Sequence, residues 1–139
     1  MHTDKKKALG IKPEGTPYRV LVIDDSSFIV KQLSKILTSE GFQIADVAAD
    51  GIEGQEKFKG LHETIDLVTL DITMPNQDGI STLGKIFEID KDANVIMISA
   101  LGMEDVIKKC LLMGAKNYIK KPLDRDKVLD RVVSVLTQN

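Results

Sequence analysis

Apolar residues fall into short continuous runs that alternate with longer stretches in which they recur every three or four positions. Residues 19–24 are mostly aliphatic and β-branched, which is typical of a strand buried on both faces. The next stretch repeats Ile29, Leu33 and Leu37 at helical spacing and stops at Gly41. The same alternation continues to the end of the chain. It predicts strands at 19–24, 42–48, 65–71, 94–99 and 117–120, and helices at about 26–40, 51–61, 80–89, 104–113 and 123–136.

Five repeats of strand and helix predict a doubly wound α/β fold, a five-stranded parallel sheet with helices on both faces. Right-handed crossovers place successive helices over the two faces of such a sheet. Ligands of these folds bind beyond the carboxyl ends of the strands. The residues that end the strands are therefore the candidate functional residues.

The first eighteen residues do not follow this pattern. Three consecutive lysines occupy positions 5–7, and Gly10, Pro13, Gly15 and Pro17 follow with only scattered apolar groups. Such a composition is typical of a flexible arm. The sequence therefore predicts an N-terminal arm at 1–18 and one domain at 19–139.

Charged and hydroxyl side chains end four of the five predicted strands. They are Asp24 and Asp25, Asp71, Ser99, and Lys121 one residue beyond the last strand. Three carboxylates at one rim repel one another unless a proton or a cation binds, so they predict a divalent metal site. A ligand set made only of oxygen favours Mg²⁺ over zinc.

Composition narrows the class of protein. The chain has 139 residues and a formal net charge of −2, so no strong overall field points to nucleic acid or to an anionic membrane. One cysteine, Cys110, excludes an intrachain disulfide. No apolar run approaches the roughly 20 residues that span a bilayer. We expect a cytoplasmic protein without membrane insertion and without a nucleic-acid partner.

Five landmarks carry a resemblance to a known family. The Asp24-Asp25 pair, the segment 71–79, Ser99-Ala100, Tyr118 and Lys121-Pro122 resemble the receiver domain of bacterial two-component response regulators. The likeness extends from residue 19 to residue 136, with the landmarks in the same order and in the same elements. It implies a flavodoxin-like fold with strand order 2-1-3-4-5, an order that the hydrophobic pattern does not supply.

The resemblance implies roles in phosphoryl transfer. Asp71 would accept a phosphoryl group from the phosphohistidine of a kinase. Lys121 would supply positive charge to the acyl phosphate, and Ser99 a hydroxyl to a phosphoryl oxygen. Ser99 and Tyr118 would form the switch, because movement of Ser99 leaves space for the tyrosine ring and changes the neighbouring face.

The resemblance also implies a ligand set for Mg²⁺. Asp25 and Asp71 would ligate the ion, Asp24 would act largely through water, and Thr73 would offer its backbone carbonyl. The chain would then be a signalling switch that promotes its own phosphorylation and dephosphorylation, and not an enzyme acting on other substrates.

The segments 66–75 and 96–102 are similar to those of chemotaxis receivers. We therefore expect a chemotaxis-type sensor histidine kinase, the flagellar motor switch protein and a phosphatase as partners. Because the receiver pattern reaches the end of the chain, we expect a stand-alone receiver.

Three alternatives remain open from the sequence. The first is a phosphorelay shuttle that passes its phosphoryl group to a histidine phosphotransfer protein. The second is an aspartyl-phosphate phosphatase of the haloacid-dehalogenase type, although that class has a second Asp where this chain has Thr73. The third is a flavodoxin-type flavin carrier, although the Asp24-Asp25 pair would repel the flavin phosphate.

Overall fold

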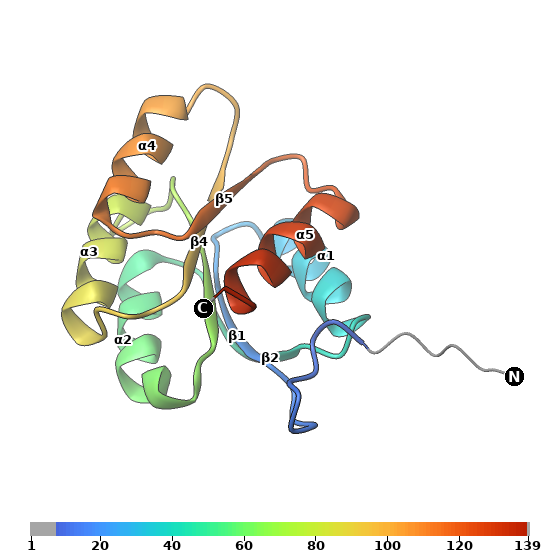
Figure 1. Cartoon of the computed structure of the whole chain (residues 1–139). Helices are drawn as coiled ribbons and strands as arrows, with labels where there is room; N and C mark the ends of the chain where they lie inside the picture. Colours follow the sequence, from blue (N-terminus) through green and yellow to red (C-terminus); the bar gives the residue numbers. More distant parts are fainter. Residues whose placement is uncertain (1–7, 139) are drawn as a thin grey trace, which may run out of the picture.

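The computed structural model describes residues 8–138 as a five-stranded sheet covered by helices (Figure 1). The strands are β1 (Arg19–Ile23), β2 (Gln43–Ala48), β3 (Leu67–Asp71), β4 (Val95–Ser99) and β5 (Asn117–Lys120). The helices are α1 (Ser27–Thr38), α2 (Gly51–Leu61), α3 (Gly79–Ile89), α4 (Glu104–Met113) and α5 (Arg125–Leu136), with a short 3-10 turn, η1 (His62–Thr64), after α2.

The sheet is parallel throughout, and its strand order is β2-β1-β3-β4-β5. Helices α1 and α5 cover one face, and α2, α3 and α4 cover the other (Figure 1). Alternate residues of one strand serve the two cores: Val20 and Val22 pack toward α1 and α5, whereas Leu21 and Ile23 pack toward the other three helices. The predicted fold class and strand order are confirmed.

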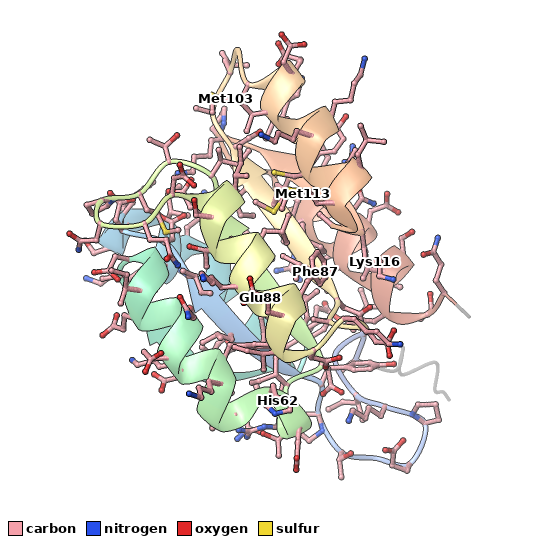
Figure 2. The ribbon with its side chains drawn as sticks, turned by 90° about the vertical axis from the view of Figure 1, so that its left-hand side faces the viewer. His62, Phe87, Glu88, Met103, Met113 and Lys116 are labelled. Carbon is pink, nitrogen blue, oxygen red and sulfur yellow. The ribbon has the colours of Figure 1, made fainter. Side chains whose placement is uncertain are left out.

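On the face covered by α2, α3 and α4, apolar side chains of α3 and α4 belong to one core cluster with the sheet. Figure 2 shows Phe87 of α3 and Met113 of α4 at the seam between these helices. Gly114 ends α4 with φ 123°, and a Cβ there would lie 3.2 Å from the ring of Phe87. Within residues 8–138, no helix is long and apolar enough to cross a membrane.

Side-chain caps begin four of the helices at the carboxyl edge of the sheet. Ser26, Asp50, Asp78 and Asp124 each accept a hydrogen bond from the backbone N–H three residues later. The cap at Asp124 also explains why α5 begins at Arg125, two residues after the predicted start. Because each cap fixes the residue at which its helix begins, the strand-end residues stay together at one rim.

Part of the segment predicted as a flexible arm packs against the domain. The Gly10 N–H donates to the Glu40 carbonyl oxygen at 2.8 Å, and the Tyr18 N–H donates to the Gly10 carbonyl oxygen at 2.8 Å. Residues 8–18 thus form a closed turn beside the end of α1. The remainder of the predicted arm, residues 1–7, lies outside the described residues.

Gly79 sets how closely α3 approaches the end of β3. A Cβ at this position would lie 2.5 Å from the Asp71 carbonyl oxygen and 2.6 Å from the Ile72 Cα. These neighbours are backbone atoms, so an added methyl group forces the helix start and the strand end apart.

We predict that Gly79→Ala lowers the free energy of unfolding by about 1–3 kcal/mol, the usual cost of overpacking. Gly60→Ala is the matched control, because nothing lies within 4 Å of a Cβ there and the site is helical. The control should be neutral or stabilising by up to about 1 kcal/mol. Urea denaturation measures both; equal stabilities of the two variants would contradict the close approach.

Candidate functional site

Three carboxylates meet at the carboxyl edge of the sheet. Asp71 is the last residue of β3, and Asp24 and Asp25 directly follow β1, the strand paired with β3. One oxygen atom from each of the three side chains lies within 4.8 Å of the others. Asp24 and Asp71 are each only 3% exposed, whereas Asp25 is exposed. The strand ends that the sequence singled out do lie together.

The electrostatics of this cluster disfavour a fully ionised state. Burial and, after it, the Asp24 charge raise the pKa of Asp71 from 3.8 to about 7, although the Lys121 ammonium partly offsets both effects. Burial also raises the pKa of Asp24, against a backbone hydrogen bond from Ser26 that lowers it. Asp71 therefore holds its proton to an unusually high pH until a cation compensates the carboxylates.

Within the part of the chain that the structure describes, one carboxylate oxygen of Asp24 lacks a hydrogen-bond partner and indicates whether a cation fits between the carboxylates. The Ser26 N–H donates to Asp24 Oδ1 at 2.9 Å, but Asp24 Oδ2 is buried and has no hydrogen-bond partner among residues 8–138. A buried carboxylate oxygen without a partner is costly. A divalent cation among the three carboxylates would satisfy it, so the donor set fits a hard, oxygen-binding metal such as Mg²⁺.

Lys121 lies at the same rim, close to the carboxylates but not in tight contact with them. Its Nζ is 3.5 Å from Asp71 Oδ1 and 3.7 Å from Asp24 Oδ2, longer than a direct hydrogen bond. The Lys121 N–H donates to the Ser99 carbonyl oxygen at 2.7 Å, and the Lys121-Pro122 peptide bond is cis. The ammonium thus supplies charge beside both carboxylates.

Ser99 ends β4 in the strand next to Asp71. Its side chain is fully buried, and its Oγ has no hydrogen-bond partner among the described residues. The Ile72 N–H donates to the Ile98 carbonyl oxygen at 3.0 Å, so the ends of β3 and β4 are in register at this level. A buried hydroxyl without a partner is a donor available to a new acceptor.

The loop after β3 is fixed by side-chain contacts that the sequence did not indicate. Asn76 has a left-handed backbone, φ 68°, and its Nδ2 donates to Asp50 Oδ2 at 2.8 Å. Gln77 Nε2 donates to the Gly51 carbonyl oxygen at 3.3 Å. These contacts tie the loop that carries Thr73 to the start of α2. The turn-forming sequence pointed to the loop, but nothing in it identified partners 26 residues away.

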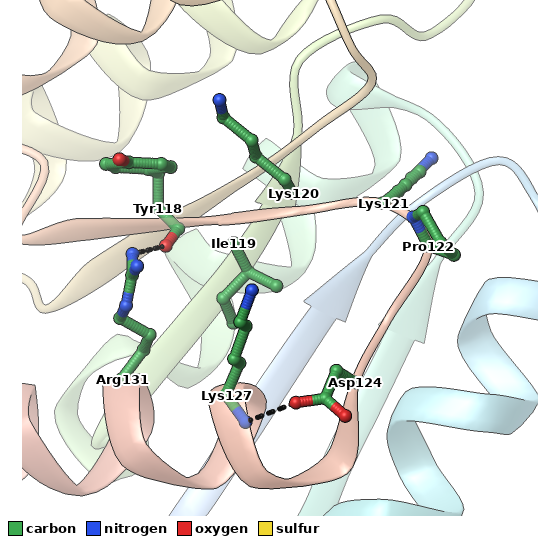
Figure 3. Close-up of a pocket in the computed structure, with 8 residues that line it drawn as sticks. All are labelled: Tyr118, Ile119, Lys120, Lys121, Pro122, Asp124, Lys127 and Arg131. Carbon is green, nitrogen blue, oxygen red and sulfur yellow. Dashed lines mark hydrogen bonds between the residues drawn. The ribbon is translucent and has the colours of Figure 1, made fainter.

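Tyr118 lies in β5 beside a residue that the sequence analysis also missed. The guanidinium carbon of Arg131 in α5 is 4.9 Å from the centre of the Tyr118 ring. Arg131 Nη1 also donates to the Tyr118 carbonyl oxygen at 2.6 Å (Figure 3). The helical spacing of apolar residues in α5 predicts its buried face, but it does not predict this polar contact.

Known proteins share both the sequence and the fold. Residues 20–133 match the response regulator receiver domain. The chain is 62% identical over 127 residues to the chemotaxis protein CheY of Treponema pallidum. This match covers 91% of this chain and 88% of that relative. It is 39% identical over 119 residues to CheY of Bacillus subtilis, covering 86% and 98%.

A solved structure gives the same result at the level of the fold. The crystal structure of the CheX-CheY-BeF3-Mg²⁺ complex from Borrelia burgdorferi contains a chain that is 57% identical to this one, with a TM-score of 0.93 over 96% of this chain and 100% of that chain. The receiver match decides against the haloacid-dehalogenase and flavodoxin alternatives, whereas the phosphorelay shuttle, itself a receiver, stays open. The acidic rim, the strand order and these relatives together lead to one conclusion: the chain belongs to the response regulator receiver domain family, as a CheY-like receiver of two-component chemotaxis signalling.

Proposed function

We propose that Asp71 accepts a phosphoryl group from the phosphohistidine of a chemotaxis sensor kinase, and that the protein signals by changed protein binding. The observation that carries this proposal is the buried Asp71 carboxylate grouped with two further carboxylates and Lys121. We place the receiver at residues 19–139, with residues 1–18 as an N-terminal extension, in the cytoplasm.

Each residue at the rim has a role in the transfer. An Asp71 carboxylate oxygen forms a bond to phosphorus while the donor's phosphorus–nitrogen bond breaks and its electron pair returns to the imidazole. Lys121 compensates the charge of the phosphoryl oxygens, and the unpartnered Ser99 hydroxyl donates to one of them. The chain thus acts as a switch that promotes its own modification.

The residues proposed to hold Mg²⁺ are the three clustered carboxylates and the backbone carbonyl of Thr73. When bound, the ion would supply charge neutralisation to the phosphoryl oxygens. Without it, burial and the Asp24 charge oppose the ionised, nucleophilic form of Asp71.

The proposed output surface is formed by α4, β5 and α5. Leu112 of α4 is 84% exposed, and Leu111 of the same helix lines a cavity of about 230 Å³ together with Ile107 and Tyr118. An exposed apolar helix face beside a cavity is suited to docking a partner segment. We propose the flagellar motor switch protein as the partner on this surface, and a CheX-like phosphatase as the partner that reaches Asp71, after the complex of the Borrelia relative.

The phosphoacceptor is tested by intact mass after incubation with acetyl phosphate. We predict a single phosphoryl adduct that requires Mg²⁺ and is lost in Asp71→Asn. Asp92→Asn is the matched control, because Asp92 is an exposed carboxylate in the loop before β4. An equal adduct on the Asp71 variant would place the phosphoryl group elsewhere.

The output partner is tested with the beryllofluoride form of the protein. We predict that this form binds a motor-switch peptide more tightly than the free protein does, because the peptide contacts the changed α4–β5–α5 surface. Transfer of the phosphoryl group to a histidine phosphotransfer domain, without peptide binding, would instead establish the shuttle alternative.

Removal of the carboxylate repulsion should stabilise the metal-free protein. Because the pKa of Asp71 is raised from 3.8 to about 7 on folding, the folded state binds more protons than the unfolded state between these pH values. The wild type therefore loses stability as the pH rises through this window. Asp71→Asn, which does not titrate, should be more stable than the wild type by about 1–3 kcal/mol at pH 7.5 and should lose this advantage near pH 4.5.

Urea denaturation in EDTA measures this difference at the two pH values. Mg²⁺ should stabilise the wild type more than the Asp71 variant at pH 7.5, because the ion binds the folded carboxylates. A stability difference independent of pH would show that Asp71 does not titrate in this range.

A further inference from the structure

We infer that Arg131 is a positioning residue that holds the Tyr118 ring in its present place and so sets how readily the switch responds to phosphorylation. This inference rests on the proposed function. It extends the switch from the rim to a residue of α5 that touches neither the metal cluster nor the phosphoacceptor.

The contacts of Arg131 fix its guanidinium against β5. Nη1 donates to the Tyr118 carbonyl oxygen at 2.6 Å and to Asn117 Oδ1 at 3.1 Å, and both bonds are partly buried. The guanidinium carbon is also 4.9 Å from the centre of the Tyr118 ring, within the range of a cation–π contact. Figure 3 shows the Arg131 side chain extending from α5 toward the Tyr118 backbone.

The Tyr118 ring lies where its position changes the surface. Tyr118 lines a cavity of about 520 Å³ on the α5 side and also the cavity of about 230 Å³ on the α4 side. This residue therefore lies between the two cavities. Displacement of its ring would change the surface presented to a partner.

In the proposed switch the ring moves toward Ser99, and such a movement would end its contact with Arg131. The guanidinium is tied to β5 by hydrogen bonds to the Tyr118 carbonyl oxygen and to the Asn117 side chain, so it does not follow the ring. The cation–π attraction consequently favours the present ring position and opposes the displaced one. A ligand that favours the displaced ring must overcome this difference.

The chemistry of arginine suits this task better than that of lysine. A planar guanidinium can present its face to a ring while its edge donates to a carbonyl, whereas an ammonium group is a point charge. Arg131→Gln removes the charge over the ring and keeps an N–H donor for the Tyr118 carbonyl. Arg131→Lys keeps the charge and should behave as an intermediate.

Fluorine NMR reads the ring position directly. The chain contains two tyrosines, Tyr18 and Tyr118, so 3-fluorotyrosine gives two signals that Tyr18→Phe assigns. We expect beryllofluoride with Mg²⁺ to shift the Tyr118 signal of the wild type. In Arg131→Gln the signal should lie partway to that position before any addition, and half-saturation should need about two- to five-fold less beryllofluoride.

Two controls separate a local from a general effect. The Tyr18 ring stacks on Phe42 with centres 6.1 Å apart, and its signal should not move. Lys127→Gln makes the same charge change one turn earlier on α5, in a residue that lines the same 520 Å³ cavity. It should match the wild type in both signal position and affinity.

The outcomes distinguish this inference from the proposed function. A wild type that does not respond to beryllofluoride would overturn the proposed phosphoacceptor. A wild-type response together with an unchanged Tyr118 signal and affinity in Arg131→Gln would overturn the role of Arg131, as would an equal effect of Lys127→Gln. If Arg131→Gln does not fold, Arg131→Lys is judged by the same criteria.

Discussion

The rim of this receiver is governed by the repulsion between two buried carboxylates. Asp24 and Asp71 end neighbouring strands at 3% exposure, where water cannot screen them well. Burial and, after it, the Asp24 charge raise the Asp71 pKa to about 7, and the ammonium of Lys121 remains 3.5 Å from Asp71. The free energy of the ionised rim is therefore high in the metal-free protein, and a cation lowers it.

The fold tolerates the repulsion between these carboxylates because the strands that carry them belong to a large buried core. The strands that carry the two carboxylates and Ser99 are almost entirely buried, so their ends cannot move apart without disturbing both helix layers. The absence of a side chain at Gly79 lets α3 begin against the Asp71 backbone. The Asn76 amide on Asp50 fixes the loop between them. The acidic rim is thus a consequence of sheet topology, and the loops hold it in place.

Sequence patterns predicted this much because hydrophobic periodicity and strand-end chemistry are local signals. The alternation of runs located every strand and helix to within a few residues, and Asp24, Asp71, Ser99 and Lys121 follow from reading the strand ends. Strand order came only from the family resemblance, because it depends on which edges pair. The docking of residues 8–18 was missed because this segment carries no periodic signal. The contact of Arg131 with Tyr118 was missed because hydrophobic periodicity does not report polar contacts between distant segments.

In the proposed switch, a change at the rim reaches the surface over a short path. The Lys121 N–H donates to the Ser99 carbonyl oxygen at 2.7 Å, and Tyr118 lies three residues before Lys121 in the strand beside Ser99. Ser99 therefore connects the rim to β5 through one backbone hydrogen bond and one buried, unpartnered hydroxyl. A phosphoryl group shifts the equilibrium between the two positions of the Tyr118 ring only as far as it stabilises one position more than the other. The Arg131 contact opposes this shift, because it stabilises the present position. The free-energy contributions of the phosphoryl group and of Arg131 act at opposite ends of β5 and nearly balance. One covalent change at the rim would therefore alter the α4–β5–α5 surface without rearrangement of the core.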